Sequence, residues 1–143
     1  MSQPSIPVPS LRRATSRHCA AAALLAALIA GGCAPHISRT ELADRIENGS
    51  APPIVDVRSG QEYAEAHVPG AVHVPFYSVW SRSDELPPSD GEPLVIYCEH
   101  GPRAGLARAG LWLAGAGEVR FLEGHMTAWK ADGLPVESDA SAD

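Results

Sequence analysis

Apolar residues along the chain form short runs that alternate with amphipathic segments. Four short, mainly apolar segments are predicted as buried strands and span residues 54–57, 71–74, 94–97 and 119–122, of which 94–97 is apolar throughout. Helices are predicted at residues 38–49, 61–66, 76–80, 103–114 and 126–131, and a polar loop is predicted at 81–93. Strands that alternate with helices predict an α/β fold, with a central parallel sheet that carries helices on both faces.

Two of the predicted helices carry specific signals. Ser38 and Glu41 have the spacing of a capping box at the start of the first helix, and Gly49 is placed to stop it. The helix at 103–114 offers three leucines to the core: Leu106, Leu111 and Leu113. Each helix therefore has one face that can cover the sheet.

The start of the chain differs in composition from the rest. Residues 1–17 carry Arg12, Arg13 and Arg17 but no acidic residue, and an uncharged apolar run follows at 19–30. This run is shorter than the roughly 20 residues that a transmembrane helix needs. A basic segment before a short apolar run predicts a secretory signal peptide.

The sequence IAGGC at residues 29–33 resembles the lipobox of bacterial lipoproteins, in which the cysteine becomes the lipidated first residue. We therefore expect an exported, periplasmic protein held on a membrane by lipidated Cys33, and on the outer membrane in a Gram-negative cell. The alternative is an ordinary signal peptide cut near Ala34. The expected organisation is a signal peptide at 1–32, a linker at 33–37, one domain at 38–137 and a disordered tail at 138–143.

Net charge excludes one class of partner. Removing the three leader arginines leaves 8 of the 11 basic residues against 17 acidic residues, a net charge of −9. Such a surface argues against binding nucleic acid. The remaining histidines lack the spacing of a ligand cluster, so we expect no metal and no cofactor, and we expect a monomer.

Cys98 becomes the lone thiol once the leader is removed and Cys33 is lipidated. Exported proteins usually pair their cysteines, so an unpaired one is either buried and inert or kept for its reactivity. Cys98 lies at the carboxyl end of the most apolar predicted strand, which is where α/β sheets bind ligands. Amides at the start of the following helix favour an anion there, either a thiolate or a bound oxyanion.

The residues that follow Cys98 fit an anion-binding loop. Gly101 permits a positive φ, and Pro102 suits the first position of a helix. Arg103 opposes the helix dipole, so a bound anion would justify its place, because a guanidinium grips oxyanions with a planar fork. The alternative is that Arg103 reaches solvent or Glu99.

The segment from Cys98 to Arg103, CEHGPR, resembles the active-site loop C-x-x-G-x-R of rhodanese-type sulfurtransferases. The sequences IVDVRSGQEYAEAHVPGAVHVP (54–75) and FLEGHMTAWKADGLPVE (121–137) resemble two further motifs of that family, in the same order, so the likeness spans residues 38–137. Ala66 and His125 replace glycines of the family pattern, and neither is expected to touch the loop.

The resemblance implies a rhodanese-like fold and a mechanism. Cys98 would take sulfane sulfur from thiosulfate or a similar donor as a persulfide, and pass it to cyanide or a thiol. Arg103 would orient the donor, Asp56 and Arg58 would support the loop, and His100 would hold the persulfide or shuttle a proton. The loop amides that would stabilise the persulfide belong to Glu99, His100, Gly101, Arg103 and Ala104. We expect Glu99 and His100 to set the choice of donor.

Two other functions compete with this one. The first is a rhodanese-fold sulfur carrier or protein-interaction module with little turnover of its own, which intact Cys98 and Arg103 disfavour. The second is a cysteine phosphatase or arsenate reductase. Those enzymes use C-x5-R, whereas four residues separate Cys98 from Arg103 here.

Overall fold

The computed structural model describes residues 35–139. The predictions of a signal peptide and of lipidation at Cys33, and the last residues of the predicted tail, lie outside the described residues. Within residues 35–139, no helix is both long enough and apolar enough to cross a membrane.

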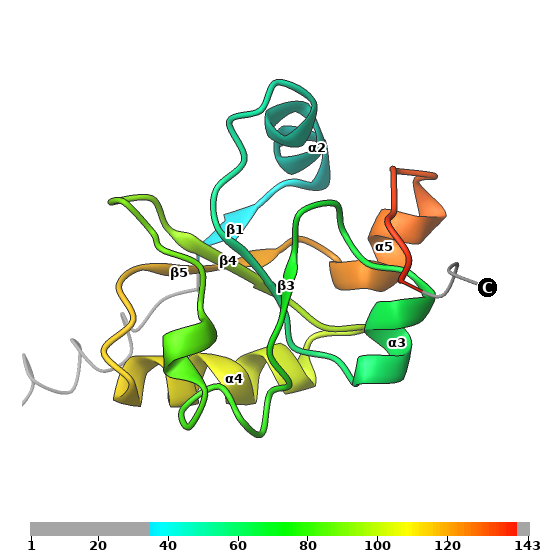
Figure 1. Ribbon diagram of the computed structural model, residues 1–143. Coiled ribbons are helices and arrows are strands. Elements are labelled where there is room, and N and C mark those ends of the chain that lie inside the picture. The colour runs from blue at the N-terminus through cyan, green and yellow to red at the C-terminus, as the bar shows by residue number, and fades with distance from the viewer. Residues whose placement is uncertain (1–34, 140–143) are drawn as a thin grey trace, which may run out of the picture. The chain divides into compact units, whose positions relative to one another are not determined.

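Five parallel strands form the sheet, in the order β1-β5-β4-β2-β3. They are β1 (His36–Ile37), β2 (Ile54–Asp56), β3 (Val72–His73), β4 (Leu94–Tyr97) and β5 (Val119–Leu122). The predicted parallel sheet is confirmed, and its most apolar strand, β4, lies in the middle (Figure 1). The two-residue strand β1 falls in the segment predicted as a linker, because so short a strand has no periodicity to read.

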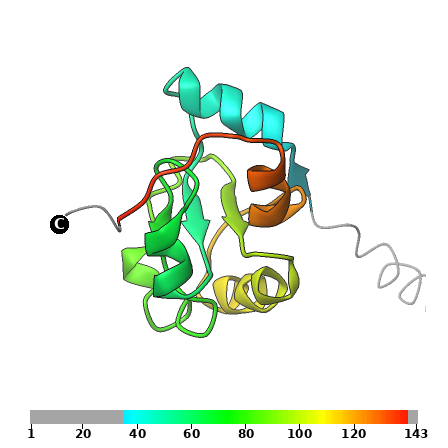
Figure 2. The same cartoon turned by 90° about the vertical axis from the view of Figure 1, so that its right-hand side faces the viewer.

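Helices cover both faces of the sheet, as predicted. In Figures 1 and 2, α2 (Arg39–Glu47) and α5 (His125–Ala131) lie on one side and α4 (Pro102–Leu113) on the other. Alternate residues of β4 divide between two cores: Val95 and Tyr97 pack with Trp129, whereas Ile96 and the following Cys98 belong to the core that α4 covers. Cys98 therefore lies on the α4 side of the sheet.

Two helix predictions need correction. Residues 76–80 form successive turns rather than a helix, and a short 3-10 helix, η1 (Ser83–Glu85), follows within the predicted loop. In α4, Leu111 is buried but Leu106 and Leu113 are exposed. Ala104 and Ala107 are the other buried residues of α4. The helix packs on the sheet through the face that carries these residues, and Leu106 and Leu113 lie on its exposed face.

Side-chain caps explain where the first two helices begin. Ser38 accepts a hydrogen bond from the amide of Glu41 at the start of α2. The helix α3 (Gly60–Glu65), predicted one residue late, begins with a full capping box between Ser59 and Glu62. Two residues of the predicted disordered tail are bonded to the domain: the Ser138 hydroxyl and the Asp139 amide both donate to the carbonyl of Ala64, in α3.

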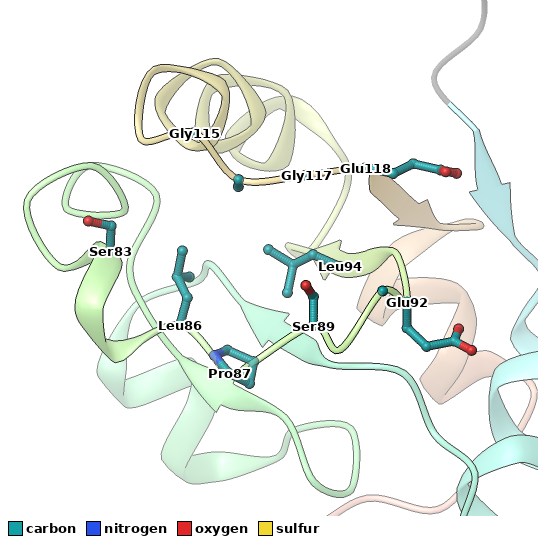
Figure 3. A pocket seen from close by; sticks show the side chains of 11 residues that line it. Ser83, Leu86, Pro87, Ser89, Glu92, Leu94, Gly115, Gly117 and Glu118 are labelled. Carbon is teal, nitrogen blue, oxygen red and sulfur yellow. The ribbon is translucent and has the colours of Figure 1, made fainter.

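A pocket of about 430 Å³ opens at the amino ends of β4 and β5 (Figure 3). Leu86 and Leu94 line its interior, while the carboxylates of Glu92 and Glu118 point away from these leucines (Figure 3). No cysteine, histidine or arginine lines this pocket. The reactive side chains gather at the opposite edge of the sheet, where β4 ends.

Candidate active site

Cys98 directly follows β4 and lies at the floor of a cup of about 310 Å³. Its thiol is free and buried, and Sγ accepts a hydrogen bond of 3.0 Å from the amide of Gly101. The cup is lined by Cys98, Glu99, His100, Pro102 and Arg103. Five residues of one loop, all between positions 98 and 103, thus line the space above a single nucleophilic atom.

The backbone at Gly101 makes the contact with sulfur possible. Its φ of 119° lies in a region that side-chain-bearing residues rarely adopt, and Gly101 is also the N-cap of α4. Pro102 is the first residue of that helix. Ala104 is buried in the α4 core. Among residues 98–104, Gly101 supplies the amide that reaches Sγ.

The two alternatives to anion binding were that Arg103 reaches solvent or pairs with Glu99. Its partner is a different residue. Its guanidinium makes a two-pronged ion pair with Glu62 of α3, with distances of 2.6 and 2.7 Å. The hydrogen bonds from Arg103 hold the pKa of Glu62 well below its usual range. Glu62 was not among the predicted site residues. Its capping-box spacing after Ser59 is a local signal, which does not reveal the tertiary contact with Arg103.

We expect replacing Glu62 with glutamine to make stability less dependent on pH in the acid range. The lowered pKa means that the native state favours the carboxylate more than the unfolded chain does. Glu62 therefore contributes stability above about pH 4.5, the pKa of the free side chain, and this contribution declines as the pH falls below it. Urea unfolding of both proteins at pH 7 and pH 3 measures this. A stability difference that is as large at pH 3 as at pH 7 would contradict it.

Asp56 and Arg58 form a buried ion pair beneath the loop. Neither side chain is exposed, and the Arg58 guanidinium donates to Asp56 at 2.7 and 3.0 Å and to Glu99 at 2.9 Å. Burial by itself lowers the pKa of Arg58, but hydrogen bonds and charge attraction from Asp56 outweigh it and raise that pKa overall. Glu99 also lies 3.6 Å from Lys130, so the carboxylate in the loop already has two cationic partners.

The two histidines near the loop come from different elements. His100 is exposed, and its Nδ1 lies 3.0 Å from the hydroxyl of Thr127, which itself donates to the carbonyl of Glu99. His125 was expected not to touch the loop, and this expectation is wrong. Its Nδ1 accepts the amide of Cys98 at 3.4 Å, because the start of α5 packs directly against the loop backbone.

No group of three or more His, Cys, Asp or Glu side chains within residues 35–139 could hold a metal ion. The nucleophilic group of this site is the Cys98 thiol. A buried thiol beside a backbone amide and a paired arginine suits a nucleophile that carries a covalent group.

Comparison with known proteins agrees with this geometry. A model of the "Rhodanese-like domain" family matches residues 38–132. A sulfurtransferase of Allochromatium vinosum is 33% identical over 100 residues, which cover 70% of this chain and 92% of that protein. An HTH-type transcriptional regulator of Mycobacterium tuberculosis, Rv0324, is 36% identical over 125 residues, or 86% of this chain. The chain spans only about half of that regulator's length, 54%.

Solved structures agree as well. The solution structure of the rhodanese-like domain of the Anabaena protein Alr3790 superposes with a TM-score of 0.64 and 28% identity. The superposition covers 76% of this chain and 82% of that one. The cysteine loop, the parallel sheet and the matched family model lead to one conclusion: the chain belongs to the rhodanese-like domain family.

Proposed function

We propose that the protein is a sulfurtransferase that moves sulfane sulfur from thiosulfate, or a similar donor, to a thiol or cyanide through a persulfide on Cys98. One observation carries the proposal. The free thiol of Cys98 lies at the floor of the loop cup with a backbone amide aimed at its sulfur, 3.0 Å away. The family relationship supports the same chemistry, since one relative is named a sulfurtransferase.

In the first step, the Cys98 thiolate attacks the outer sulfur of thiosulfate. A new S–S bond forms, the bond between the two sulfurs of thiosulfate breaks, and sulfite leaves with the electron pair of that bond. The negative charge then lies on the outer sulfur of the persulfide. Hydrogen bonds from preorganised loop amides, starting with Gly101, stabilise that charge at no reorganisation cost.

In the second step, cyanide or a thiolate attacks the outer sulfur and the Cys98 thiolate leaves. With cyanide the product is thiocyanate, and the enzyme returns to its first state. No external oxidant or reductant is needed, because sulfur is transferred at a constant total oxidation state. Alternating half-reactions of this kind give ping-pong kinetics.

Glu62 fixes the orientation of Arg103, the residue that we assign to donor binding. The guanidinium is held in a fixed direction by two hydrogen bonds, so its orientation costs little when a donor arrives. Glu62 engages two of the five guanidinium N–H groups, so others remain for the sulfonate oxygens of the donor. The nearby Glu62 carboxylate also balances part of the Arg103 charge, which weakens the attraction of a dianion.

We expect replacing Arg103 with lysine to raise the KM for thiosulfate about tenfold, with a smaller change in kcat. Lysine keeps the charge but loses the planar fork, and one charge-assisted hydrogen bond is worth about 1.5–3 kcal/mol. Steady-state thiocyanate formation measures both constants. Arg108→Lys, on the exposed side of α4, is the matched control and should leave KM unchanged. An unaltered KM in Arg103→Lys would contradict donor binding by this residue.

The direct test of the function is the intact mass of the purified protein after incubation with thiosulfate. We expect a gain of one sulfur, located at Cys98 by peptide mapping and removed by cyanide. Prior alkylation of Cys98 should block the gain. Failure to take up sulfur from thiosulfate, with Cys98 free, would overturn the thiosulfate activity.

The runner-up is a sulfur carrier that receives its sulfur from a protein persulfide. One feature favours it: the fork of Arg103 is already occupied by Glu62. A carrier would gain sulfur from a persulfidated protein donor but not from thiosulfate, so the same mass measurement with two donors separates the two functions.

We also propose that the protein is exported and anchored through Cys33. The basic and apolar segments before that cysteine and the IAGGC sequence support it. Metabolic labelling with a fatty acid tests it: label on the native chain but none on Cys33→Ser is expected, and equal label on both would overturn it.

A further inference from the structure

His125 occupies a backbone position that ordinarily belongs to glycine. Its φ is +54°, and it follows Gly124, whose φ is +68°. Besides His125, the positive-φ residues other than glycine within 35–139 comprise only Asp90. A side chain kept in such a conformation indicates that its contacts compensate for the strain, and at functional sites such strain is frequent.

The His125 ring lies near Phe121 of β5 in a tilted arrangement, and its polar contacts go to the cysteine loop. The His125 Nδ1 accepts the amide of Cys98 at 3.4 Å. The other ring nitrogen, Nε2, lies so near Gly101 that a Cβ on that glycine would be only 3.1 Å away. The imidazole therefore touches both residues whose backbone and side chain make the Sγ contact.

The next two residues of α5 complete the same contact surface. The amide of Met126 donates to the carbonyl of Cys98 at 3.0 Å, and the amide of Thr127 donates to the carbonyl of Glu99 at 3.2 Å. Both backbone groups of Cys98 are thus bonded to the start of α5. The Cys98 carbonyl is bonded by a backbone amide, whereas the Cys98 amide is bonded by a side chain, that of His125.

The protonation state of the ring follows from its role as acceptor. Because Nδ1 accepts a hydrogen bond, a neutral His125 must carry its proton on Nε2. Burial, with smaller effects from His36 and His100, lowers the pKa of His125, which favours the neutral ring at neutral pH.

We propose that His125 is a positioning residue for sulfur transfer at Cys98: it accepts the Cys98 amide and packs on Gly101, so that the Gly101 amide stays aimed at Sγ. Its part in catalysis rests on the proposed sulfurtransferase function, but the contact itself does not. Glycine at this position would relieve the backbone strain, but it would lack a side chain to contact Cys98 and Gly101.

Two variants separate the contact from the strain. His125→Gly removes the acceptor and relieves the positive φ. His125→Asn keeps an acceptor atom at the same distance along the side chain, and asparagine tolerates positive φ better than most residues. With ¹⁵N-cysteine in the full chain, the Cys98 amide signal is assigned by its loss in Cys98→Ser. We expect this amide to shift and to exchange with D₂O about tenfold faster in His125→Gly, but to stay near wild type in His125→Asn.

Kinetics and stability then test positioning against a merely structural role. We expect His125→Gly to lower kcat for sulfur transfer about tenfold, with an unchanged KM for thiosulfate and no loss of unfolding free energy, and His125→Asn to restore kcat. An unshifted Cys98 amide in His125→Gly, or a wild-type kcat in that variant, would overturn the proposal. If the wild type takes up no sulfur, the proposed function fails, while the amide comparison still decides the contact.

Discussion

Replacing Cys98 with serine is expected to abolish sulfur transfer, on the order of 10⁴-fold or more, which is the size of loss that removal of a covalent nucleophile produces. The thiolate is the species that attacks sulfur, and a serine hydroxyl keeps its proton at neutral pH. Serine still offers an acceptor to the Gly101 amide at the floor of the cup. The variant should therefore fold normally, and thiocyanate formation from thiosulfate and cyanide measures the loss.

The matched control removes the other cysteines of the chain. Cys19→Ser and Cys33→Ser, combined, should retain full sulfur uptake, because neither residue belongs to the loop. Cys98→Ala should be as inactive as Cys98→Ser, although it also leaves the Gly101 amide without its sulfur acceptor. Persulfide formation on any residue of Cys98→Ser at the wild-type rate would disprove the proposed mechanism.

Local sequence signals predicted the centre of the sheet well. Both β4 and β5 have the predicted bounds. β4 is a continuous apolar run, as is typical of a strand buried on both faces, whereas β5 includes the charged Arg120. The core face of α4 was predicted less well. Leucine spacing indicated Leu106 and Leu113, whereas the helix packs through Ala104 and Ala107. How closely a helix approaches a sheet depends on the partner surface, which the helical sequence alone does not contain.

The residues of the candidate site also differ in how far the sequence could predict them. Cys98, Gly101 and Arg103 lie in one loop, so their proximity could be predicted from their spacing in the sequence. Glu62 is 41 residues from Arg103, and His125 is 27 residues from Cys98, and only the fold brings these pairs together. His125 replaces a glycine of the family pattern, and this departure places an imidazole against the loop.

Replacing Arg58 with alanine is expected to reduce the free energy of unfolding by about 3–5 kcal/mol, the usual cost of leaving one partner of a buried ion pair uncompensated. Asp56 is fully buried. Once the Arg58 guanidinium is removed, the backbone amide of residue 58 is the one group of that residue that still donates to the Asp56 carboxylate. The carbonyl of Ala66 and the carboxylate of Glu99 would also lose a donor. Urea denaturation at neutral pH measures the change.

Two comparisons show whether burial of the charge is the cause. Arg82→Ala removes an arginine whose ion pair with Glu85 is exposed, so its unfolding free energy should stay close to wild type. Asp56→Asn should cost less than Arg58→Ala, because Arg58 would still have Glu99 as an anionic partner. If Arg58→Ala is too unstable to fold, Arg58→Lys keeps the charge and should show an intermediate loss. Equal losses of unfolding free energy in Arg58→Ala and Arg82→Ala would contradict the prediction, because the buried pair would then contribute no more to stability than a surface pair. The support that Arg58 gives to the cysteine loop would in that case come from its contact with Glu99 alone.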